Sequence, residues 1–428
     1  MALIDAVTHD GRGIAAVGGK KVFVAGALVG ETVRFVRRKR HRNYDEAELV
    51  DVVDASASRI EPRCAVFGSC GGCAMQHVGD AEQRAQKAQA LADSLERIGK
   101  VTPEAWLEPL HADQSWHYRR RARLAVKDVA LKGRVLVGFR ERHAPYVCDM
   151  HRCEVLAKPV DGLLDELSDL IGQLTLRSRL PQVEVAIADN ATALVFRVLD
   201  PPTGEDLAAF REFGARHGLQ IGLQTGGPDS VEMLVGDEPL VYSLPDFSID
   251  IEFDATDFVQ VNAAVNRQMV SRAVDLLELE AGHRVLDLYC GIGNFSLPLA
   301  RCAAYVLGVE GEAHQVRRAR ANARRNGIDN CEFRQADLAA IDGSEPWFRQ
   351  HFDRVLLDPA RSGAEDVVRR IDRTGATRLV YVSCHPGTLA RDAGLLVNEQ
   401  GFVLEAAGII DMFPHTGHVE AIASFRKR

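Results

Sequence analysis

The stretch VLDLYCGIGNFSLPLA, residues 285–300, begins as an apolar strand, turns at two glycines and continues in a helical pattern. Gly291 and Gly293 have no β-carbon, so the backbone of this turn can approach a ligand closely. A Gly-x-Gly pair alone is a weak signal, because ordinary strand–helix turns also contain one. The context strengthens it, since apolar strands alternate with helices from about residue 262 onward. This alternation predicts a parallel, doubly wound, Rossmann-like α/β sheet.

Acidic residues end the next two predicted strands. Glu310 ends YVLGVE, 19 residues after Gly291, where a carboxylate can accept hydrogen bonds from ribose hydroxyls. Asp337 ends CEFRQAD. The glycine turn lacks the third glycine of a pyrophosphate-binding loop, and no phosphate-binding cation stands beside Glu310. These residues therefore favour S-adenosylmethionine, an adenosyl ligand without phosphates, over a dinucleotide.

Two further predicted strands end in chemically useful residues, Asp358 in RVLLDPAR and Cys384 in RLVYVSCHP. Ligands of such sheets bind at the carboxyl ends of the strands, so both side chains should face one crevice. A thiolate that adds to carbon 6 of uracil makes carbon 5 nucleophilic, and a base must remove the proton on carbon 5 after methyl transfer. We predict Cys384 as the nucleophile, Asp358 as a partner of the uracil edge and Glu420 as the base. His415 and His418 could compete with Glu420, and a free cysteine is often only a small buried hydrophobe.

Three of the nine cysteines lie in CAVFGSCGGC, residues 64–73. No basic segment followed by an apolar one is readable at the start, and no apolar stretch is long enough to span a membrane, so we expect a cytoplasmic protein. Cysteines in such a protein bind metals or act in catalysis more often than they form disulfides. The spacing alone leaves two groups open, an iron–sulfur cluster and a zinc ion held by four thiolates.

The length of 428 residues suggests two or three domains. Residues 1–54 alternate with period two between glycine turns, which predicts a small β-barrel of the oligonucleotide-binding type. Residues 62–260 mix strands and helices, which predicts an α+β domain that carries the cysteine cluster. Residues 261–428 form the predicted α/β domain, against which a helix at 80–99 could pack.

The charge distribution bears on the choice of partner. A net charge of -8 argues against a nucleic-acid binder, but phosphate contacts depend on local patches. RRKRHR at 37–42 and YRRRAR at 118–123 are two such basic patches. One patch alone would be a solvated surface, whereas two in the first third of an acidic chain favour a track for a polyanion.

Several motifs resemble those of the bacterial RNA uracil-5-methyltransferases, in the same order: DFVQVN, DLYCGIGNFSLPLA, LLDPARSG, YVSCHPGTLARD and DMFPHTGHVE. The segment DGRGIAAVGGKKVFVAGALVGETV, residues 10–33, resembles the TRAM domain, an oligonucleotide-binding barrel. CAVFGSCGGCAMQH with the later CEVLAKP resembles the [4Fe-4S] site of that family. The match extends over nearly the whole chain and is best to members that modify 23S rRNA. The resemblance therefore implies 23S rRNA as the partner, without a membrane or an obligate protein partner.

The resemblance also implies roles for single residues. Cys384 would be the nucleophile and Glu420 the base. The pocket for cofactor and uracil would be lined by Gln260, Tyr289, Asn294, Glu310, Asp337 and Asp358, beside Gly291 of the glycine turn. The cluster would be held by Cys64, Cys70, Cys73 and Cys153, with Cys148 as an extra cysteine. Tyr289 and Asp337 stand where relatives often have Phe and Asn, which puts details of the cofactor contacts in question.

Other functions stay open at this point. A methyltransferase acting on cytosine or on an exocyclic amine would use the same cofactor but would need no thiol at position 384. A tRNA uracil-5-methyltransferase would share the chemistry and differ in the substrate. A non-catalytic RNA-binding protein with an iron–sulfur cluster would keep the cysteines and need none of Cys384, Asp358 and Glu420.

Overall fold

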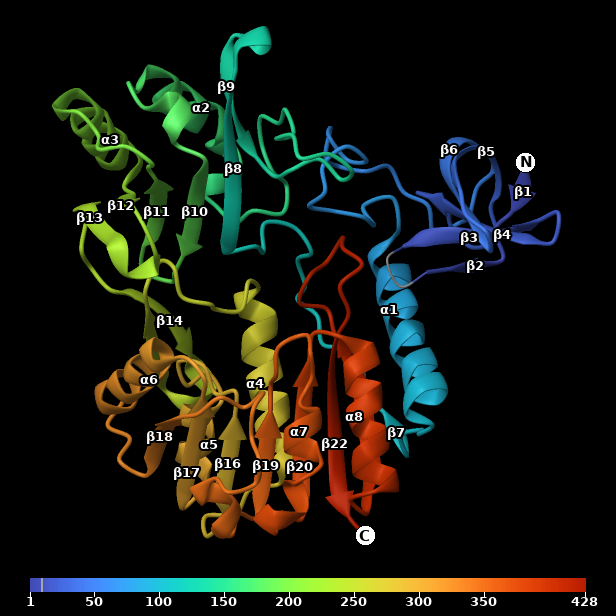
Figure 1. Cartoon of the computed structure of the whole chain (residues 1–428), viewed down its shortest axis with the longest axis vertical. Helices are drawn as coiled ribbons and strands as arrows, with labels where there is room; N and C mark the ends of the chain where they lie inside the picture. Colours follow the sequence, from blue (N-terminus) through green and yellow to red (C-terminus); the bar gives the residue numbers. More distant parts are fainter. Residues whose placement is uncertain (9–10) are drawn as a thin grey trace. The chain divides into compact units, whose positions relative to one another are not determined.

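The computed structural model describes residues 1–8 and 11–428, so residue 10 of the TRAM-like segment lies outside the described part. The chain divides into two units (Figure 1). The first comprises Met1–Lys87, Asp113–Glu238 and Phe413–His418, and the second comprises Ala88–Ala112, Pro239–Met412 and Val419–Arg428. Residues 239–260 belong to the second unit, although the sequence pattern predicts them as part of the α+β domain. The division into three domains stays a prediction.

The first unit begins with a six-stranded sheet. Its order is β1 (Ala2–Leu3), β5 (Thr32–Arg40), β6 (Tyr44–Asp54), β4 (Lys20–Ala25), β3 (Arg12–Val17) and β2 (Ala6–Val7). β1 pairs with β5 and β2 pairs with β3, and only Ile4 and Asp5 separate β1 from β2. The segment 2–7 therefore connects the two edges of the sheet. Ile4, Val22 and Val33 lie in the small core that this arrangement encloses.

A second six-stranded sheet completes the first unit. Its order is β13 (Val231–Val235), β12 (Gln220–Gln224), β11 (Thr192–Arg197), β10 (Gln182–Ile187), β8 (Arg121–Val129) and β9 (Arg134–Gly138). Helix α2 (Leu164–Gln173) precedes β10, and helix α3 (Gly204–His217) links the parallel pair β11 and β12. The other neighbours in this sheet are antiparallel. The strands and helices of this region agree with the predicted α+β pattern.

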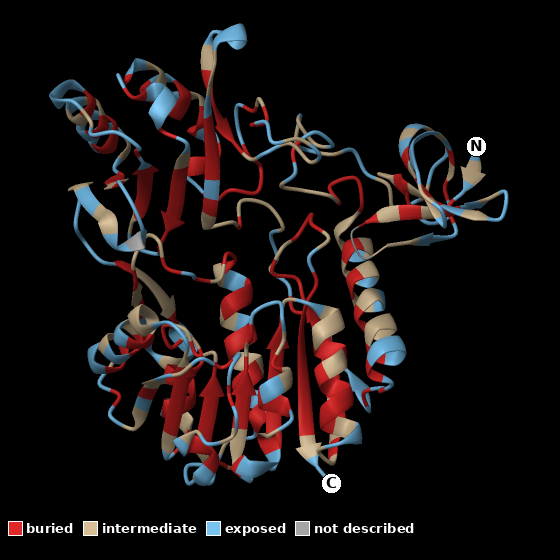
Figure 2. Cartoon of the chain, viewed as in Figure 1, coloured by how far each residue is buried: buried red, intermediate tan, exposed pale blue. Residues whose placement is uncertain are grey.

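The second unit is built on an eight-stranded sheet, whose strands are mostly buried (Figure 2). Its order is β18 (Cys331–Gln335), β17 (Tyr305–Glu310), β16 (Arg284–Leu288), β19 (Arg354–Leu357), β20 (Arg378–Ser383), β22 (Glu420–Lys427), β21 (Phe402–Ile410) and β7 (Ala105–Trp106). The run from β18 to β20 is parallel, with Leu286 opposite both Leu307 and Val355, and β22 is antiparallel to β20. The prediction of a parallel Rossmann-like sheet is therefore confirmed.

Helices of the second unit connect and flank these strands. They are α4 (Ala263–Leu277), α5 (Ser296–Cys302), α6 (Ala313–Arg325), α7 (Glu365–Val368) and α8 (Pro386–Asn398). A hairpin of β14 (Leu240–Leu244) and β15 (Ile249–Phe253) precedes α4. The predicted helix at 80–99 consists of α1 (Asp80–Ser94) and the π-helical turn η1 (Leu95–Gly99). Leu91 and Leu95 are buried in the core of this unit. Among the described helices, none has the length and apolar character to cross a membrane.

Candidate active site

The carboxyl ends of the parallel strands in the second unit border a cavity of about 370 Å³. Eight of the predicted site residues line it: Gln260, Tyr289, Gly291, Asn294, Glu310, Asp358, Cys384 and Glu420. They come from segments spread over 160 residues of sequence, between positions 260 and 420. Parallel strands bring their ends to one edge of the sheet, which explains why these residues meet. Asp337 is exposed after β18 and is not among the lining residues.

The turn after β16 has a backbone shape that suits glycine. Gly291 and Gly293 have φ angles of 55° and 100°, and Tyr289 also lies in the left-handed region at 66°. The Gly291 N–H donates to Oε2 of Glu310 over 3.0 Å, and the Glu312 N–H donates to Oε1 over 3.1 Å. Both oxygens of Glu310 are thus oriented by backbone amides. Each oxygen keeps a lone pair that can accept a hydroxyl hydrogen.

Asn294 is held in one orientation by two partners. Its Oδ1 accepts hydrogen bonds of 3.0 Å from the Tyr242 hydroxyl and from Nδ2 of Asn266. Its own Nδ2 donates to Oδ1 of Asn266 over 3.0 Å. Tyr242 comes from β14 and Asn266 from α4, so the hairpin and the helix fix this wall of the cavity. Tyr242 also lines the cavity and was not predicted from the sequence, because β14 lies far from the glycine turn along the chain.

Burial and neighbouring charge raise the pKa values of two groups at these strand ends, Asp358 and Cys384. Removal from water raises the pKa of Asp358 to about 7, and the charge of Glu310 adds to this effect. Burial also raises the pKa of the Cys384 thiol, with further contributions from Glu420 and Asp358, while Arg361 acts in the opposite direction. The thiol of the free protein is therefore protonated at neutral pH and must lose its proton before it can attack, and Glu420 and Asp358 are the carboxylates whose charges act on it.

Asp287 lies on β16, two residues before the cavity residue Tyr289, and is fully buried. Burial raises its pKa to about 8, and the Ser296 hydroxyl donates to its Oδ2. Within the described part of the chain, its Oδ1 has no hydrogen-bond partner. A buried carboxyl oxygen without a hydrogen-bond partner lowers the stability of the folded state, so this oxygen can accept a hydrogen bond from a ligand or store strain.

A family model described as tRNA (Uracil-5-)-methyltransferase matches residues 80–428. The chain belongs to the RNA uracil-5-methyltransferase family. It is an enzyme that transfers a methyl group from S-adenosylmethionine to carbon 5 of uracil. The predicted family, cofactor and reaction type are thereby confirmed.

Curated relatives match the methyltransferase over its full length. A protein of Xanthomonas axonopodis pv. citri named 23S rRNA (uracil(1939)-C(5))-methyltransferase RlmD is 48% identical over 426 residues, which cover 99% of this chain and 96% of the relative. A protein of the same name from Aromatoleum aromaticum is 47% identical over 431 residues, covering 100% and 99%. The crystal structure of Pyrococcus abyssi tRNA (uracil-54, C5)-methyltransferase with S-adenosyl-L-homocysteine has a TM-score of 0.77 at 23% identity, covering 99% and 98%. At that identity the likeness concerns the fold.

The two histidines of the motif DMFPHTGHVE are placed differently from Glu420. His415 is buried in the first unit, where its N–H donates to Oε1 of Gln83 over 2.7 Å and its ring stacks on Trp116 at 3.8 Å. His418 is exposed and its ring contacts Phe413. Neither histidine lines the cavity of the methyltransferase, whereas Glu420 does. This placement favours Glu420 over both as the base.

All four predicted cluster ligands line a second, smaller cavity in the first unit of the methyltransferase: Cys64, Cys70, Cys73 and Cys153. Phe67, Phe139 and Met150 provide apolar walls. Burial raises the pKa of Cys73 to about 11 and that of Cys153 to about 12. Within residues 1–8 and 11–428, no three thiols lie within 4.8 Å of one another. Cys148 is buried but does not line this cavity.

One other group of metal-ligand type occurs in the described residues. Asp254, Asp257 and His314 present ligand atoms within 4.8 Å of one another. Nε2 of His314 lies 2.7 Å from Asp257, and the Arg318 guanidinium pairs with both aspartates. The positive charge that such a group attracts is thus already supplied by arginine. This network joins helix α6 to the segment that leads to Gln260.

Proposed function

We propose that the methyltransferase forms 5-methyluridine at a specific uridine of 23S rRNA. The observation that carries the reaction is the single cavity lined by Cys384, Glu420 and Asp358 together with the residues predicted for the cofactor. The choice of RNA rests on the full-length match to relatives named for 23S rRNA. The family model and the similar crystal structure carry tRNA in their names, which makes tRNA the second candidate substrate.

Three side chains have separate roles in the reaction. Cys384 passes its proton to Asp358 or Glu420, the two carboxylates whose charges act on it, and adds through sulfur to carbon 6 of uracil. The addition places an enolate on the ring with nucleophilic carbon 5. Bound S-adenosylmethionine supplies the methyl group. Glu420 then removes the proton from carbon 5, and the electron pair of that bond re-forms the ring double bond as sulfur leaves carbon 6. Asp358, whose pKa of about 7 keeps part of it protonated, can donate a hydrogen bond to the enolate oxygen.

The remaining predicted residues would bind the cofactor. Glu310 is oriented by two backbone amides to accept hydrogen bonds from ribose hydroxyls. Gly291 lets the backbone approach, while Tyr289, Asn294 and Gln260 complete the cavity wall. Asp337, which was predicted for the same pocket, is exposed and does not line the cavity, so no cofactor contact is proposed for it. The methyltransferase alone should bind S-adenosylhomocysteine through these residues.

We also propose a [4Fe-4S] cluster on Cys64, Cys70, Cys73 and Cys153. Four thiols around one apolar cavity fit a metal group. Among the described residues no three thiols all lie within 4.8 Å of one another, whereas sulfurs that share a tetrahedral zinc ion at 2.3 Å are roughly 3.8 Å apart. The cluster would tie the loop 64–73 to position 153 and so stabilise the first unit. Anaerobically purified protein should contain about four iron and four sulfide per chain. Cys153→Ser should lose them and Cys148→Ser should keep them, whereas zinc in place of iron would refute the cluster.

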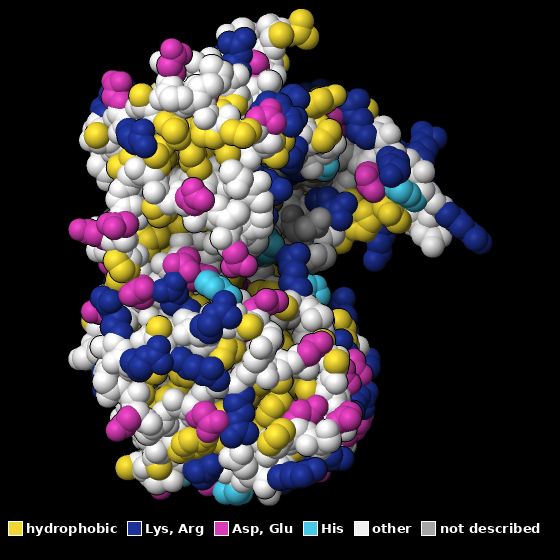
Figure 3. All heavy atoms as spheres, turned by 60° about the vertical axis from the view of Figure 1, so that its left-hand side comes forward, with side chains coloured by type: hydrophobic (Ala, Val, Ile, Leu, Met, Phe, Trp, Pro, Cys, Tyr) yellow, Lys and Arg dark blue, Asp and Glu magenta, His cyan; other side chains and the backbone are white. Residues whose placement is uncertain are grey.

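The N-terminal sheet is proposed as a TRAM domain that contacts the RNA. Its strand order, its connected edges and the parallel pair β4 and β6 suit a five-stranded oligonucleotide-binding barrel. Lys and Arg side chains stand out from this sheet in Figure 3. The second basic patch is less available, because Arg120 pairs with Asp189 and Arg123 pairs with Glu184.

The test offers labelled S-adenosylmethionine and an equal mixture of unmodified 23S rRNA and tRNA to the purified protein. The RNAs are then separated and their nucleosides analysed. Label in 5-methyluridine from 23S rRNA is expected. Label in tRNA would keep the chemistry and replace the substrate, and label in another nucleoside would refute the roles of Cys384 and Glu420. A Cys384→Ala variant should transfer no methyl group, and turnover by that variant would point to an amine methylase.

A further inference from the structure

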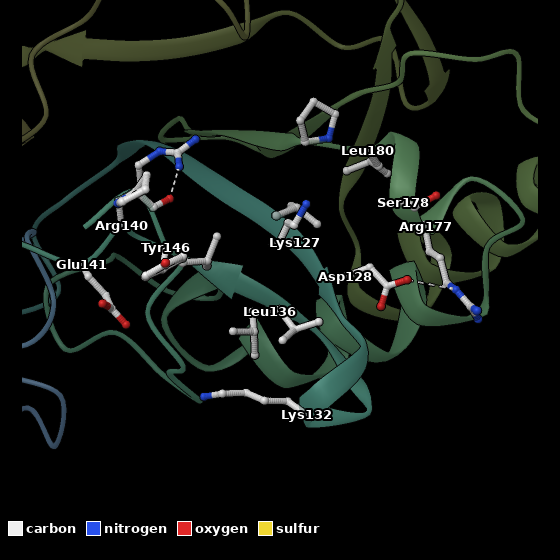
Figure 4. A pocket seen from close by; sticks show the side chains of 15 residues that line it. Lys127, Asp128, Lys132, Leu136, Arg140, Glu141, Tyr146, Arg177, Ser178 and Leu180 are labelled. Atoms are coloured by element: carbon white, nitrogen blue, oxygen red, sulfur yellow. Dashed lines mark hydrogen bonds and ion pairs between the residues drawn. The ribbon is translucent and has the colours of Figure 1, made fainter.

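The first unit contains a hollow of about 640 Å³ that takes no part in the functions proposed above (Figure 4). Its walls come from β8, from β9, from the segment 140–147 and from the segment 177–181. The volume lies in the range of sites that bind small organic groups. The side chains that line the hollow indicate which chemical group it could bind.

The floor of the hollow is apolar and its rim carries an exposed aromatic ring. Leu136 and Val147 are 4% and 7% exposed and belong to a small hydrophobic cluster with Ala125. Tyr146, the neighbour of Val147, is 68% exposed. A buried apolar floor beside an open aromatic face suits a flat ring that stacks.

The charges that line the hollow are mainly positive. Four lining side chains are basic and two are acidic: Lys127, Lys132, Arg140 and Arg177, with Asp128 and Glu141. Nε of Arg177 lies 3.3 Å from Asp128, and Nζ of Lys132 lies 2.6 Å from Asp149. Both of these cations are therefore neutralised.

Two cations remain for a ligand. Arg140 donates from Nη1 to the Pro145 carbonyl, and within residues 1–8 and 11–428 no ion pair joins it to a carboxylate. Lys127 is exposed, and in the described part of the chain it forms no ion pair. Figure 4 shows Arg140 beside Tyr146 on one side of the hollow and Lys127 in its middle. Glu141 offsets only one of these two charges, so the hollow favours an anion.

We propose that this hollow binds one unstacked nucleotide of the substrate RNA, with its base on the Tyr146 ring and its phosphate near Lys127 and Arg140. The proposal rests on the proposed RNA methyltransferase function. An enzyme that turns its target base out of the stack works best on looped RNA, whose neighbouring bases are also unstacked. Aromatic rings and basic side chains are the groups that hold such bases and their phosphates.

The part of the rim with Arg140 and Tyr146 forms a hairpin that is hydrogen-bonded to the cysteine loop 64–73. The Gly71 N–H donates to the Arg140 carbonyl over 2.9 Å, and the Cys148 N–H donates to the Phe139 carbonyl over 2.9 Å. Arg140 and Val147 also form a β-bridge, which closes the hairpin that presents Tyr146. The hollow therefore has its shape before RNA arrives, which lowers the entropic cost of binding.

The experiment measures binding and turnover of a 23S rRNA fragment that contains the uridine methylated by the wild-type protein. Tyr146→Ala should weaken binding roughly tenfold or more, the effect of losing one base–aromatic stack, and Tyr146→Phe should stay within about twofold of wild type. Lys127→Gln should reduce the slope of log K against log salt by about 0.7. Arg211→Gln, an exposed position on α3 outside the hollow, is the matched control. KM should rise in Tyr146→Ala while kcat at saturating RNA stays unchanged.

Two results would overturn the proposal. One is equal RNA affinity for Tyr146→Ala, Tyr146→Phe and the control. The other is binding of free uridine or adenosine monophosphate to the hollow that leaves RNA affinity unchanged, which would assign the site to a free nucleotide. In both cases the wild-type protein would still methylate the fragment. A wild-type protein that transfers no methyl group to any uridine of 23S rRNA would instead refute the proposed function.

Discussion

At the scale of single residues, the charges around Cys384 set the reactivity of its thiol. Burial, Glu420 and Asp358 raise the pKa of Cys384, and Arg361 lowers it. Glu420→Gln removes one negative neighbour and should lower that pKa. Alkylation of Cys384 by iodoacetamide at pH 7.5 should then be faster than in wild type, by roughly threefold or more, because the thiolate is the reacting form. Mass spectrometry of the peptide that contains Cys384 gives the rate.

The control for this prediction changes the charge in the other direction. Arg361→Ala removes the positive neighbour, so alkylation of Cys384 should become slower. Turnover by Glu420→Gln should stop after methyl transfer, with the methylated uracil still bonded to Cys384, because the proton on carbon 5 has no base. An alkylation rate that is unchanged or reduced in Glu420→Gln would contradict the charge pattern of the cavity.

Asp287 makes stability depend on pH. Its pKa rises from the ordinary 3.8 to about 8 on folding, because the carboxyl is fully buried. The folded state therefore holds the proton more tightly than the unfolded state, and the free energy of unfolding should fall as the pH rises from about 4 to about 8. Asp358, with a pKa raised to about 7, acts in the same direction.

Asp287→Asn should make this fall shallower, because an amide does not ionise. Urea unfolding at pH 5, 6.5 and 8, followed by the fluorescence of Trp347 in the core of the second unit, measures the effect. Asp229→Asn, at an exposed site in the first unit, serves as the control and should leave the slope unchanged. Equal slopes for Asp287→Asn and wild type would show that Asp287 stays ionised in the folded protein.

At the scale of elements, the contact between η1 and α8 depends on two glycines. A β-carbon on Gly99 would clash with the Ala390 carbonyl, and one on Gly394 would lie 2.7 Å from the Gly99 carbonyl. Gly99→Ala should therefore destabilise the second unit by about 1–3 kcal/mol, as overpacking does. Gly172→Ala on α2, where no atom lies within 4 Å of the added carbon, should instead be neutral or stabilising by up to about 1 kcal/mol. Thermal unfolding of both variants gives the comparison, and equal melting temperatures would contradict it.

The sequence predicted correctly the elements whose signals lie in contiguous residues. The strand at 284–288, its glycine turn and the acidic end of the next strand are contiguous signals, and the meeting of Asp358 and Cys384 with them follows from parallel strand order. Tyr242 was missed, because its contact with Asn294 joins residues 52 positions apart without a periodic signal. The sequence also did not predict that arginines within 119–123 are paired with carboxylates. Glu184, the partner of Arg123, is 61 residues away along the chain.

At the scale of the whole molecule, a chain with a net negative charge must bind a polyanion through local clusters of positive side chains. The net charge is -8, yet Arg37–Arg40 on β5 are all exposed. Arg37 pairs with Asp45 and Arg38 with Glu48. Across the described residues, no ion pair joins Lys39, Arg40 or Arg42 to a carboxylate. These three cations are therefore the best candidates on the N-terminal sheet for contacts with phosphate.

Replacing Lys39, Arg40 and Arg42 together by Gln should weaken RNA binding and make it less sensitive to salt. Each lost phosphate contact lowers the slope of log K against log salt by about 0.7 for single-stranded RNA, so the triple variant should lose up to about 2. Fluorescence anisotropy with a 23S rRNA fragment between 50 and 200 mM salt measures the slope, a range in which such contacts change affinity by orders of magnitude. Affinity for S-adenosylhomocysteine should stay the same, because the cofactor residues lie in the second unit. A triple variant with the wild-type slope would place the RNA on another surface. Because Arg120 and Arg123 are paired with carboxylates, the hollow around Tyr146 would then be the next surface to test.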